Sequence, residues 1–259
     1  MSYLDELYSL TGKTAVVIGG GGVLAGSMAE GLAKAGANIV ILDLNLENAL
    51  NKAEELKKYN VRTSAIRIDA SLKPDLEKAS KQIEEEFGGA DIVINAPGIN
   101  SATPFFEITE EEYDKIMAIN LKSMFLSCQI FGRMMIEHGK HGSIINISSV
   151  SSGPPLSKVF TYSLSKAGVN NITQFLAKEW AQHNIRVNAI APGFFPAEQN
   201  RKILTKDRVD SIFRHTPMNR FGDPGELTGA VIWLASEKAS SFVTGAVIRV
   251  DGGYTAMTI

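Results

Sequence analysis

Short apolar runs alternate with amphipathic segments along the whole chain of 259 residues, and this alternation constrains the fold most. The runs are rich in Val and Ile and apolar on both faces, as in strands buried on both sides. Seven strands are expected, at residues 14–18, 38–43, 61–68, 91–96, 142–149, 185–191 and 246–250. Apolar residues recur at helical spacing at 23–36, 46–59, 76–87, 110–137, 162–181 and 225–236. The alternation predicts an α/β fold, a doubly wound parallel sheet with helices on both faces.

The chain shows no internal repeat, low-complexity tract or Pro/Gly-rich linker that would divide it. We therefore expect one domain over residues 1–259 that binds a dinucleotide and carries the catalytic groups. The stretch 193–223 lacks a clear pattern. An insertion of this length in a compact domain is usually a binding loop or lid, so we expect it to cover the substrate.

The composition excludes several classes of partner. A net charge of −2 gives no basic excess for nucleic acid or an anionic membrane, and no apolar run approaches the roughly 18 residues of a membrane span. The N-terminal stretch lacks a signal-peptide pattern, and the single cysteine, Cys128, fits a reducing compartment, so we expect the cytoplasm. His138 and His141 have no further ligand placed beside them, so no metal is expected.

Four consecutive glycines, Gly19 to Gly22, lie between the first strand and the first helix. In doubly wound sheets this turn meets the pyrophosphate of a dinucleotide at the helix N-terminus. Asp43 ends the second strand about 20 residues further on, where an acid would bind the adenosine ribose hydroxyls. The alternatives are a flexible linker for the glycines and a simple turn residue for Asp43. The two features together favour a dinucleotide site.

A second motif lies in the stretch "SSVSSGPPLSKVFTYSLSK". Tyr162 and Lys166 are four residues apart, so on a helix they share one face. An ammonium group within about 4–6 Å favours the phenolate and lowers the pKa of a tyrosine toward the range where acid–base catalysts work. Ser149 ends the fifth strand and would bond the substrate oxygen. Such a pair occurs by chance on many helices, so it is weak evidence alone.

With these motifs in place, nearly the whole chain resembles the short-chain dehydrogenases/reductases of the compact, single-domain type. The family's Tyr-x-x-x-Lys matches Tyr162 to Lys166, its serine matches Ser149, and its catalytic asparagine matches Asn120 in "IMAINLKSMF". The resemblance implies NAD (NADH) as cofactor and a set of cofactor-binding residues: Gly19, Gly22, Val23, Leu24, Asp43, Leu44, Asp69, Ala70, Asn95, Ala96, Gly98, Tyr162, Lys166, Pro192, Gly193 and Phe195.

The resemblance also implies a reaction, in which hydride passes between the nicotinamide and an alcohol or ketone carbon. Tyr162 would move the hydroxyl proton, Lys166 would lower the pKa of Tyr162, and Ser149 would orient the substrate. Asn120 would hold a water that links Lys166 to solvent. The family's assembly implies a homotetramer, with the apolar helix around 113–135 packed against its copy in a partner.

The glycine turn departs from the family pattern. The usual Thr-Gly-x-x-x-Gly-x-Gly starts here at Ile18, and its second and third glycines fall on Val23 and Ala25. We expect Gly20, Gly21 and Gly22 to supply the conformational freedom instead.

The loop "PGFFPAEQNRKIL" resembles the same loop in short-chain enzymes of sugar acids, such as fructuronate reductase (D-mannonate oxidoreductase) and keto-gluconate reductases. Asn200 and Arg201 would join Ser149 and Tyr162 in binding the substrate, with the Arg201 guanidinium on its carboxylate. Reduction of a polyol, 3-oxoacyl or steroid ketone is the alternative. A non-catalytic NAD sensor and a sugar-nucleotide epimerase or dehydratase are further alternatives.

Overall fold

A single parallel sheet forms the centre of the protein in the computed structural model, which describes residues 2–196 and 205–257. All neighbouring strands pair in parallel, in the order β3-β2-β1-β4-β5-β6-β7. The bounds are β1 (Thr14–Ile18), β2 (Asn38–Asp43), β3 (Thr63–Arg67), β4 (Ile92–Asn95), β5 (Gly142–Ile147), β6 (Ile185–Pro192) and β7 (Val247–Val250). The seven predicted strands and the doubly wound, Rossmann-like fold are confirmed.

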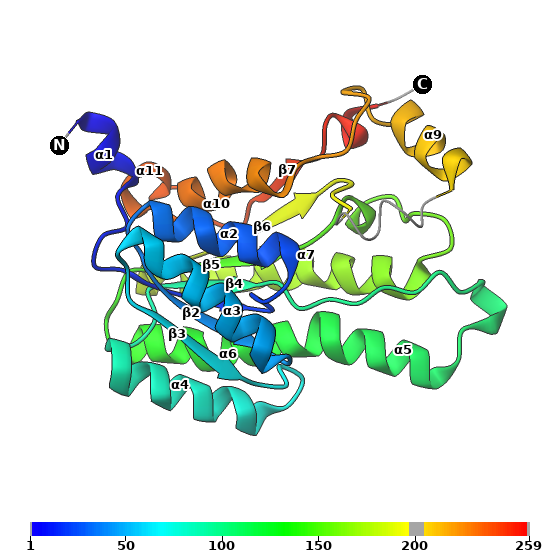
Figure 1. The fold of residues 1–259 in the computed structure, drawn as a ribbon. Coiled ribbons are helices and arrows are strands. Elements are labelled where there is room, and N and C mark those ends of the chain that lie inside the picture. Colours follow the sequence, from blue (N-terminus) through cyan, green and yellow to red (C-terminus); the bar gives the residue numbers. More distant parts are fainter. Residues whose placement is uncertain (1, 197–204, 258–259) are drawn as a thin grey trace.

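Helices cover both faces of the sheet, as Figure 1 shows. The larger helices are α2 (Val23–Lys34), α3 (Leu46–Leu56), α4 (Lys73–Phe87), α5 (Glu110–Met117), α6 (Ser123–Glu137), α7 (Phe160–Trp180) and α10 (Thr228–Ala235). One core cluster joins the sheet to α2, α3 and α10, and the other joins it to α4, α6 and α7. Val16 and Val17 are fully buried in opposite clusters, which is why the central strands are apolar on both faces.

The strand order reverses next to β1. The chain runs from β1 outward to β2 and β3, and it then returns to place β4 on the other side of β1. The loops that leave the carboxyl ends of β1 and β4 therefore diverge and open a crevice, which is the usual ligand position in such sheets. The glycine turn follows β1, and residues 96–98 follow β4, so both line this crevice.

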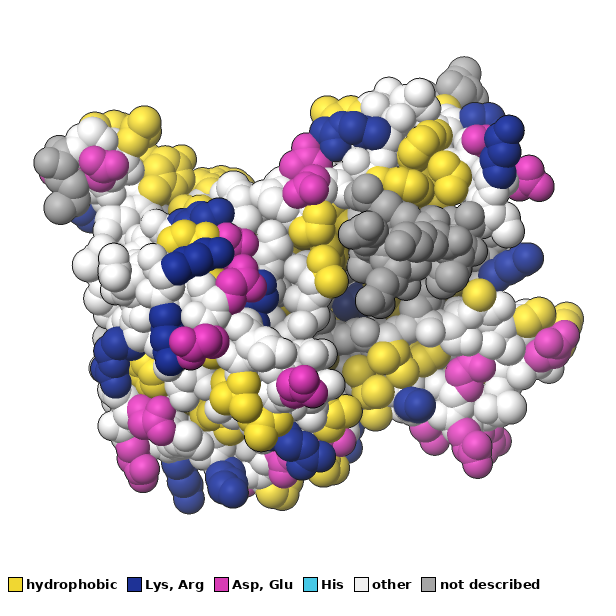
Figure 2. Space-filling model, viewed as in Figure 1, with side chains coloured by type: hydrophobic (Ala, Val, Ile, Leu, Met, Phe, Trp, Pro, Cys, Tyr) yellow, Lys and Arg dark blue, Asp and Glu magenta, His cyan; other side chains and the backbone are white. Residues whose placement is uncertain are grey.

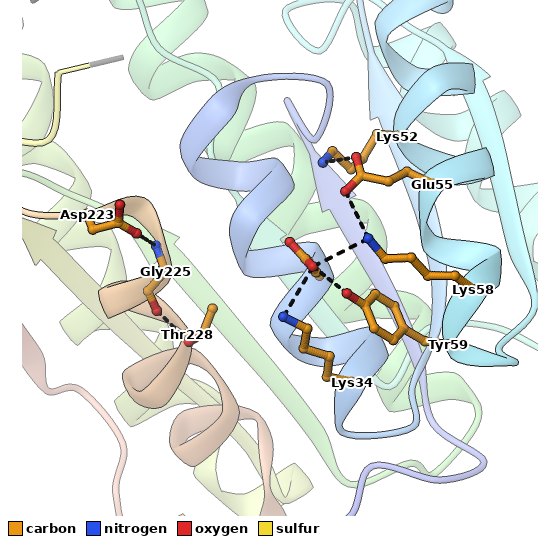
Figure 3. A network of polar contacts seen from close by, with 9 residues as sticks. Lys34, Lys52, Glu55, Lys58, Tyr59, Asp223, Gly225 and Thr228 are labelled. Carbon is orange, nitrogen blue, oxygen red and sulfur yellow. Dashed lines mark hydrogen bonds and ion pairs between the residues drawn. The ribbon is translucent and has the colours of Figure 1, made fainter. Parts of the chain in front are cut away.

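Charged side chains hold α2 in place beside α3. Glu30 on α2 forms ion pairs with Lys34 and Lys58 and accepts a hydrogen bond from Tyr59 in η1 (Lys57–Tyr59), the 3-10 turn after α3. Figure 3 shows this network of Lys34, Lys58 and Tyr59. Across the figure, Thr228 at the start of α10 packs against the position of Gly31. The C-terminal half of α2 is thus held from two sides.

Three short helices were missing from the sequence interpretation: α1 (Tyr3–Tyr8), α9 (Lys206–Arg214) and α11 (Glu237–Ser240). The predicted helix 110–137 is present, but the π-helical turn η3 (Ala118–Lys122) separates α5 from α6. The stretch 193–223 contains α9 rather than loop alone, and residues 197–204 lie outside the described part of the chain. In Figure 1, α9 lies beside the turn near the C-terminus. The segment after α9 is hydrogen-bonded to this turn, because Met218 N–H donates to Gly252 O at 3.1 Å.

Basic and acidic side chains are interspersed over the face shown in Figure 2, so the described residues form no large patch of one sign there. In the part of the chain that the structure describes, no helix is both long and apolar enough to cross a membrane.

Candidate active site

Gly19, Gly20 and Gly21 are required for different reasons. Gly19 has a positive φ of +78°, in the left-handed region that suits glycine. A Cβ on Gly20 would lie 2.9 Å from Val17 O, and one on Gly21 would lie 2.8 Å from the Asn48 Cβ. The expectation that Gly20 to Gly22 supply conformational freedom is therefore wrong, because none of the three has a positive φ, and Gly20 and Gly21 instead lack the space for a side chain.

The turn leads directly into the N-terminus of α2. Gly22 is the N-cap and has no side chain to satisfy the first-turn N–H groups, which have no partner within the helix. These donors and the positive end of the helix dipole form an anion site, and they fit a dinucleotide pyrophosphate. Val23 is exposed and Leu24 is half-buried at this edge, so both border the predicted phosphate position.

Asp43 faces the glycine turn from the end of β2. Its Oδ2 accepts a hydrogen bond from Gly21 N–H at 2.9 Å, and its Oδ1 accepts one from Asn45 N–H at 2.9 Å. Each oxygen keeps a second lone pair, so the carboxylate is oriented and still able to accept hydroxyl hydrogens. Leu44 is exposed beside it. The residues present therefore fit the adenosine ribose of a dinucleotide.

Asp69 and Ala70 follow β3 and are both half-buried. Asp69 Oδ1 accepts hydrogen bonds from Ser71 N–H at 2.9 Å and from the Ser71 hydroxyl at 2.6 Å, while Asp69 N–H donates to Asp75 Oδ2 at 2.9 Å. This turn fixes the loop after β3, and the contact of the two residues with a cofactor stays a prediction.

Asn95 is a structural residue whose role the sequence did not indicate. It is fully buried, and its Nδ2 donates to Asn146 Oδ1 at 2.9 Å, while Ser127 donates to its Oδ1 at 2.6 Å. The side chain thereby links β4, β5 and α6, which leaves its backbone for contact with a cofactor. Cys128 belongs to the same buried cluster, where burial raises the pKa of its thiol to about 12, so it is a packed side chain.

The loop after β4 approaches the catalytic groups. Ala96 N–H donates to Ile18 O at 3.1 Å, which ties the loop to β1. A Cβ on Gly98 would lie 3.5 Å from Lys166 Nζ and 3.7 Å from Asn120 Oδ1. The structure thus brings together Gly98, Asn120 and Lys166, which are far apart in the sequence.

Tyr162 and Lys166 lie on α7, and Lys166 Nζ is 5.6 Å from the centre of the Tyr162 ring. Lys166 is 3% exposed, and its ammonium donates to Ile147 O at 2.8 Å. Burial lowers the pKa of Lys166 to about 8, because the buried charge is poorly solvated.

The expectation that Lys166 lowers the pKa of Tyr162 stays a prediction, and the structure adds two other influences on this pKa. Burial raises the pKa of Tyr162, and a hydrogen bond with Ser149 acts in the opposite direction. The physical reason is that burial disfavours the charged phenolate more than the Ser149 hydrogen bond favours it, so the pKa of Tyr162 rises.

Ser149 lies at the point where β5 gives way to the short helix η4 (Val150–Ser152), for which it is the N-cap. It is 8% exposed, and its Oγ accepts hydrogen bonds from Ser151 N–H at 3.2 Å and from the Ser151 hydroxyl at 3.1 Å. These donors fix the Ser149 Oγ, and its role in orienting the substrate oxygen stays a prediction.

Asn120 lies in the π-helical turn η3 and is fully buried. Its Oδ1 accepts from Ile99 N–H at 2.8 Å, its Nδ2 donates to Ile99 O at 2.9 Å, and Nδ2 also approaches Ser165 Oγ at 3.1 Å. Ser165 in turn donates to Tyr162 O at 2.7 Å. Neither Ile99 nor Ser165 was singled out from the sequence, since their contact with Asn120 arises from tertiary structure.

The loop after β6 closes the other side of the site. Gly193 N–H bonds Val250 O at 2.9 Å, and a Cβ on Gly193 would lie 2.7 Å from Asp251 Cα, so Pro192 and Gly193 are fixed against the end of β7. The ring of Phe195 fills the space beside Gly222. Asn200 and Arg201, the predicted substrate residues, lie outside the described residues.

Among residues 2–196 and 205–257, no group of three or more His, Cys, Asp or Glu side chains is placed to hold a metal ion. His138 and His141 instead contact Glu84 and Glu237, at 2.8 Å and 2.6 Å.

Comparisons with known proteins agree with this geometry. A family profile described as enoyl-(acyl carrier protein) reductase matches residues 22–255. The 5-keto-D-gluconate 5-reductase of Escherichia coli K12 is 36% identical over 251 residues, which cover 96% of this chain and 98% of the relative.

Two solved structures show the same fold. A gluconate 5-dehydrogenase from Burkholderia cenocepacia, in complex with NADP and tartrate, superposes with a TM-score of 0.94 at 33% identity, covering 99% and 100% of the two chains. A protein assigned as a D-mannonate oxidoreductase from Haemophilus influenzae, with bound NAD, gives 0.92 at 35% identity, covering 98% and 99%. With its crevice, its Tyr162–Lys166 pair and these relatives, the chain belongs to the short-chain dehydrogenase/reductase family of oxidoreductases.

Proposed function

We propose that the protein is an NAD-dependent oxidoreductase of a six-carbon sugar acid, of the fructuronate/mannonate or keto-gluconate type. The observation that carries the chemistry is the buried ammonium of Lys166, whose Nζ lies 5.6 Å from the centre of the Tyr162 ring on the same helix. Reduction of a polyol, 3-oxoacyl or steroid ketone is the alternative within the same chemistry.

Each catalytic residue has a distinct task in this proposal. Bound NAD(H) supplies hydride transfer at the nicotinamide. Tyr162 donates the proton to the carbonyl oxygen of a ketone, or removes it from the hydroxyl of an alcohol, while Ser149 bonds the same oxygen and holds it in place. Lys166 stabilises the phenolate and bonds the nicotinamide ribose, and Asn120 holds a water through which Lys166 exchanges protons with solvent.

The preference for NAD rests on Asp43. NADP carries a 2′-phosphate that would meet the Asp43 carboxylate, and the neighbouring Leu44 and Asn45 bring no positive charge. One related structure holds NADP and another holds NAD, so the relatives support a nicotinamide cofactor of either kind. The Asp43 carboxylate is the feature of this chain that favours NAD. The remaining predicted cofactor residues, from Gly19 to Phe195, are part of the same proposal.

The substrate class rests on the relatives and on the loop after β6. Three similar proteins bear names that refer to gluconate or mannonate, and one was crystallised with tartrate, a hydroxylated dicarboxylate. Asn200 and Arg201 remain the residues proposed from the sequence to recognise such a substrate.

The wider organisation is proposed from the family likeness. We infer one domain over residues 1–259 with a lid at 193–223, a homotetramer, and the cytoplasm as compartment. Phe125 on α6 and Phe175 on α7 are 46% and 60% exposed, which supports an interface on this pair of helices.

A panel of keto sugar acids, neutral ketoses, acyl thioesters and steroids, read by NADH absorbance, tests the function. We expect turnover with a sugar acid, and we expect Tyr162→Phe to abolish nearly all of it while NADH still binds. Tyr8→Phe, on α1, is the matched control and should keep full turnover. Activity confined to steroids or acyl thioesters would disprove the substrate class, and near-normal turnover of Tyr162→Phe would disprove the acid–base role.

A further inference from the structure

A cavity of about 640 Å³ adjoins the catalytic serine and has no assigned role. The loop after β5, helix α7, strands β6 and β7 and the turn near the C-terminus enclose it, and Ser149 forms part of its wall. Several hydrogen-bonding side chains reach this wall, namely Ser152, Gln174, His215 and Tyr254. The cavity thus borders the predicted reaction centre at Ser149, and its lining suits a hydroxylated molecule.

Arg249 on β7 is the charged group of this cavity. Its side chain is exposed, and within the described residues it has no hydrogen bond and no carboxylate within 4.0 Å. None of the described residues that line the cavity is Asp or Glu. An uncompensated guanidinium in an acid-free cavity favours an anion, and its planar fork matches a carboxylate.

Two acids border Arg249 from a second cavity, but both are already engaged. Glu226 accepts two hydrogen bonds from Arg220, at 2.8 Å and 2.7 Å. Asp251 accepts from Gly253 N–H, Thr255 N–H and the Thr255 hydroxyl, at 3.0 Å, 3.0 Å and 2.6 Å. Arg249 therefore remains available to a ligand.

The strand register places Arg249 within reach of a substrate bound at Ser149. Arg249 pairs with Ala191 on β6, and Ser148, the residue directly after β5, donates its N–H to Ile190 O. Two strand spacings, about 10 Å, separate the two sides of the cavity. Val187 and Ala191 are four residues apart on β6, so their side chains point to the same face of the sheet. Val187 packs in the core cluster that contains α7, and Arg249 is paired with Ala191, so the Arg249 side chain projects on the face that α7 covers.

We propose that this cavity is the subsite for the acid end of the substrate, with the Arg249 guanidinium on the carboxylate. The inference rests on the proposed function for its substrate class. His215 donates Nδ1–H to Ser211 O at 2.8 Å, which leaves Nε2 to accept a substrate hydroxyl. The reacting carbon then lies at Ser149 and Tyr162, and the carboxylate lies across the cavity from them.

Arg249→Gln tests the subsite in the full-length protein, with Arg67→Gln as the matched control because Arg67 is an exposed arginine on the opposite edge strand, β3. We expect Arg249→Gln to raise KM for 5-keto-D-gluconate about tenfold or more, as loss of a charged hydrogen bond does. The kcat and the KM for the neutral ketose D-fructose should change less than about threefold, and Arg67→Gln should change neither.

A second readout does not depend on turnover. Tartrate should raise the thermal unfolding midpoint of the wild type and of Arg67→Gln but not of Arg249→Gln, with neutral threitol as the control ligand. If this pattern holds while no sugar acid is turned over, the anion subsite stands and the proposed substrate fails.

Three results would overturn the subsite. The first is an unchanged KM for the acid in Arg249→Gln while tartrate still raises its midpoint. The second is a selective loss for the acid in Arg201→Gln and not in Arg249→Gln. The third is dissociation of Arg249→Gln by light scattering with equal losses for acid and ketose, since Arg249 would then be an interface residue.

Discussion

At the scale of single residues, burial controls the protonation of the catalytic pair. Lys166 is surrounded by protein and holds one fixed hydrogen bond to Ile147 O, so its ammonium is destabilised and its pKa falls to about 8. The same burial raises the pKa of Tyr162. The spacing of the two residues was enough to predict their shared helix face, but desolvation depends on the packing around them and could not be derived from spacing.

The low pKa of Lys166 predicts a stability effect with a definite sign. The folded pKa is about 8 and the unfolded value about 10.4, so between these values the unfolded chain binds more protons and stability rises with pH. Relative to Lys166→Met, the wild type should gain up to about 3 kcal/mol across this window. Thermal unfolding midpoints of both proteins from pH 7.5 to 9.5 check this, and a constant difference between them contradicts it.

Asp43 predicts the choice of cofactor. We expect the wild type to prefer NAD to NADP by at least about tenfold in kcat/KM, roughly 1.4 kcal/mol, because the 2′-phosphate would meet a like charge. Asp43→Ala should erode the preference but also removes the acceptor of Gly21 N–H. Asp43→Asn keeps an acceptor and removes the charge, so it isolates the electrostatic effect. Equal efficiency of the wild type with both cofactors would refute the assignment.

At the scale of elements, the sequence predicted those whose stability comes from burial of apolar side chains. The central strands are apolar on both faces and were found, together with the large helices. Helices α1, α9 and α11 are short and are fixed at their starts by the side chains of Ser2, Thr205 and Ser236. Each of these capping signals is a single residue, and the periodicity of apolar side chains therefore does not predict these helices.

The π-helical turn at Asn120 is a further element that periodicity could not show. Ser165 accepts from Asn120 Nδ2 and donates to Tyr162 O, so it connects the turn to α7 and acts as a positioning residue. Ser165→Ala should lower kcat about 5- to 30-fold, the range expected for loss of a buried hydrogen bond of 1–2 kcal/mol. The pH profile of kcat should shift as well if Asn120 holds the proposed water near Lys166, because the substitution removes the hydrogen bond from Asn120 Nδ2 to Ser165.

Ser163→Ala is the matched control for Ser165→Ala. Ser163 is 3% exposed on the same helix, and its hydroxyl has no hydrogen-bond partner in the part of the chain that the structure describes. It should leave kcat and its pH profile unchanged. Equal effects of the two substitutions would indicate a general loss of helix packing instead of positioning.

At the scale of the whole molecule, topology assembles the site. Asp43, Gly98, Ser149 and Gly193 each follow or end a different strand, and the parallel arrangement brings all these strand ends to one edge of the sheet. That is why motifs spread over the chain predicted a common site. The register between β6 and β7, which brings Arg249 toward Ser149, depends on sheet pairing and was not predictable from any motif.

The assembly prediction also belongs to the whole molecule. Most apolar residues of the helix around 113–135 are buried within the protomer, including Met124, Cys128 and Phe131, so the expected second face is smaller than the sequence indicated. The large apolar side chains that remain exposed on α6 and α7 are Phe125, Phe160, Leu164 and Phe175, at 46%, 42%, 40% and 60%. A partner subunit that packs on these two helices would bury them. Such an interface would involve α7, the helix that also carries Tyr162.

We therefore expect Phe175→Lys to reduce the mass of the wild-type assembly, measured by light scattering at micromolar concentration, because a charged side chain in an apolar interface is costly. Leu50→Lys is the control, since Leu50 is 51% exposed on α3, a helix on the opposite face of the sheet. The assembly of the Leu50→Lys variant should have the same mass as that of the wild type. A monomeric wild type would exclude the tetramer, and an unchanged mass in Phe175→Lys would move the interface away from α7.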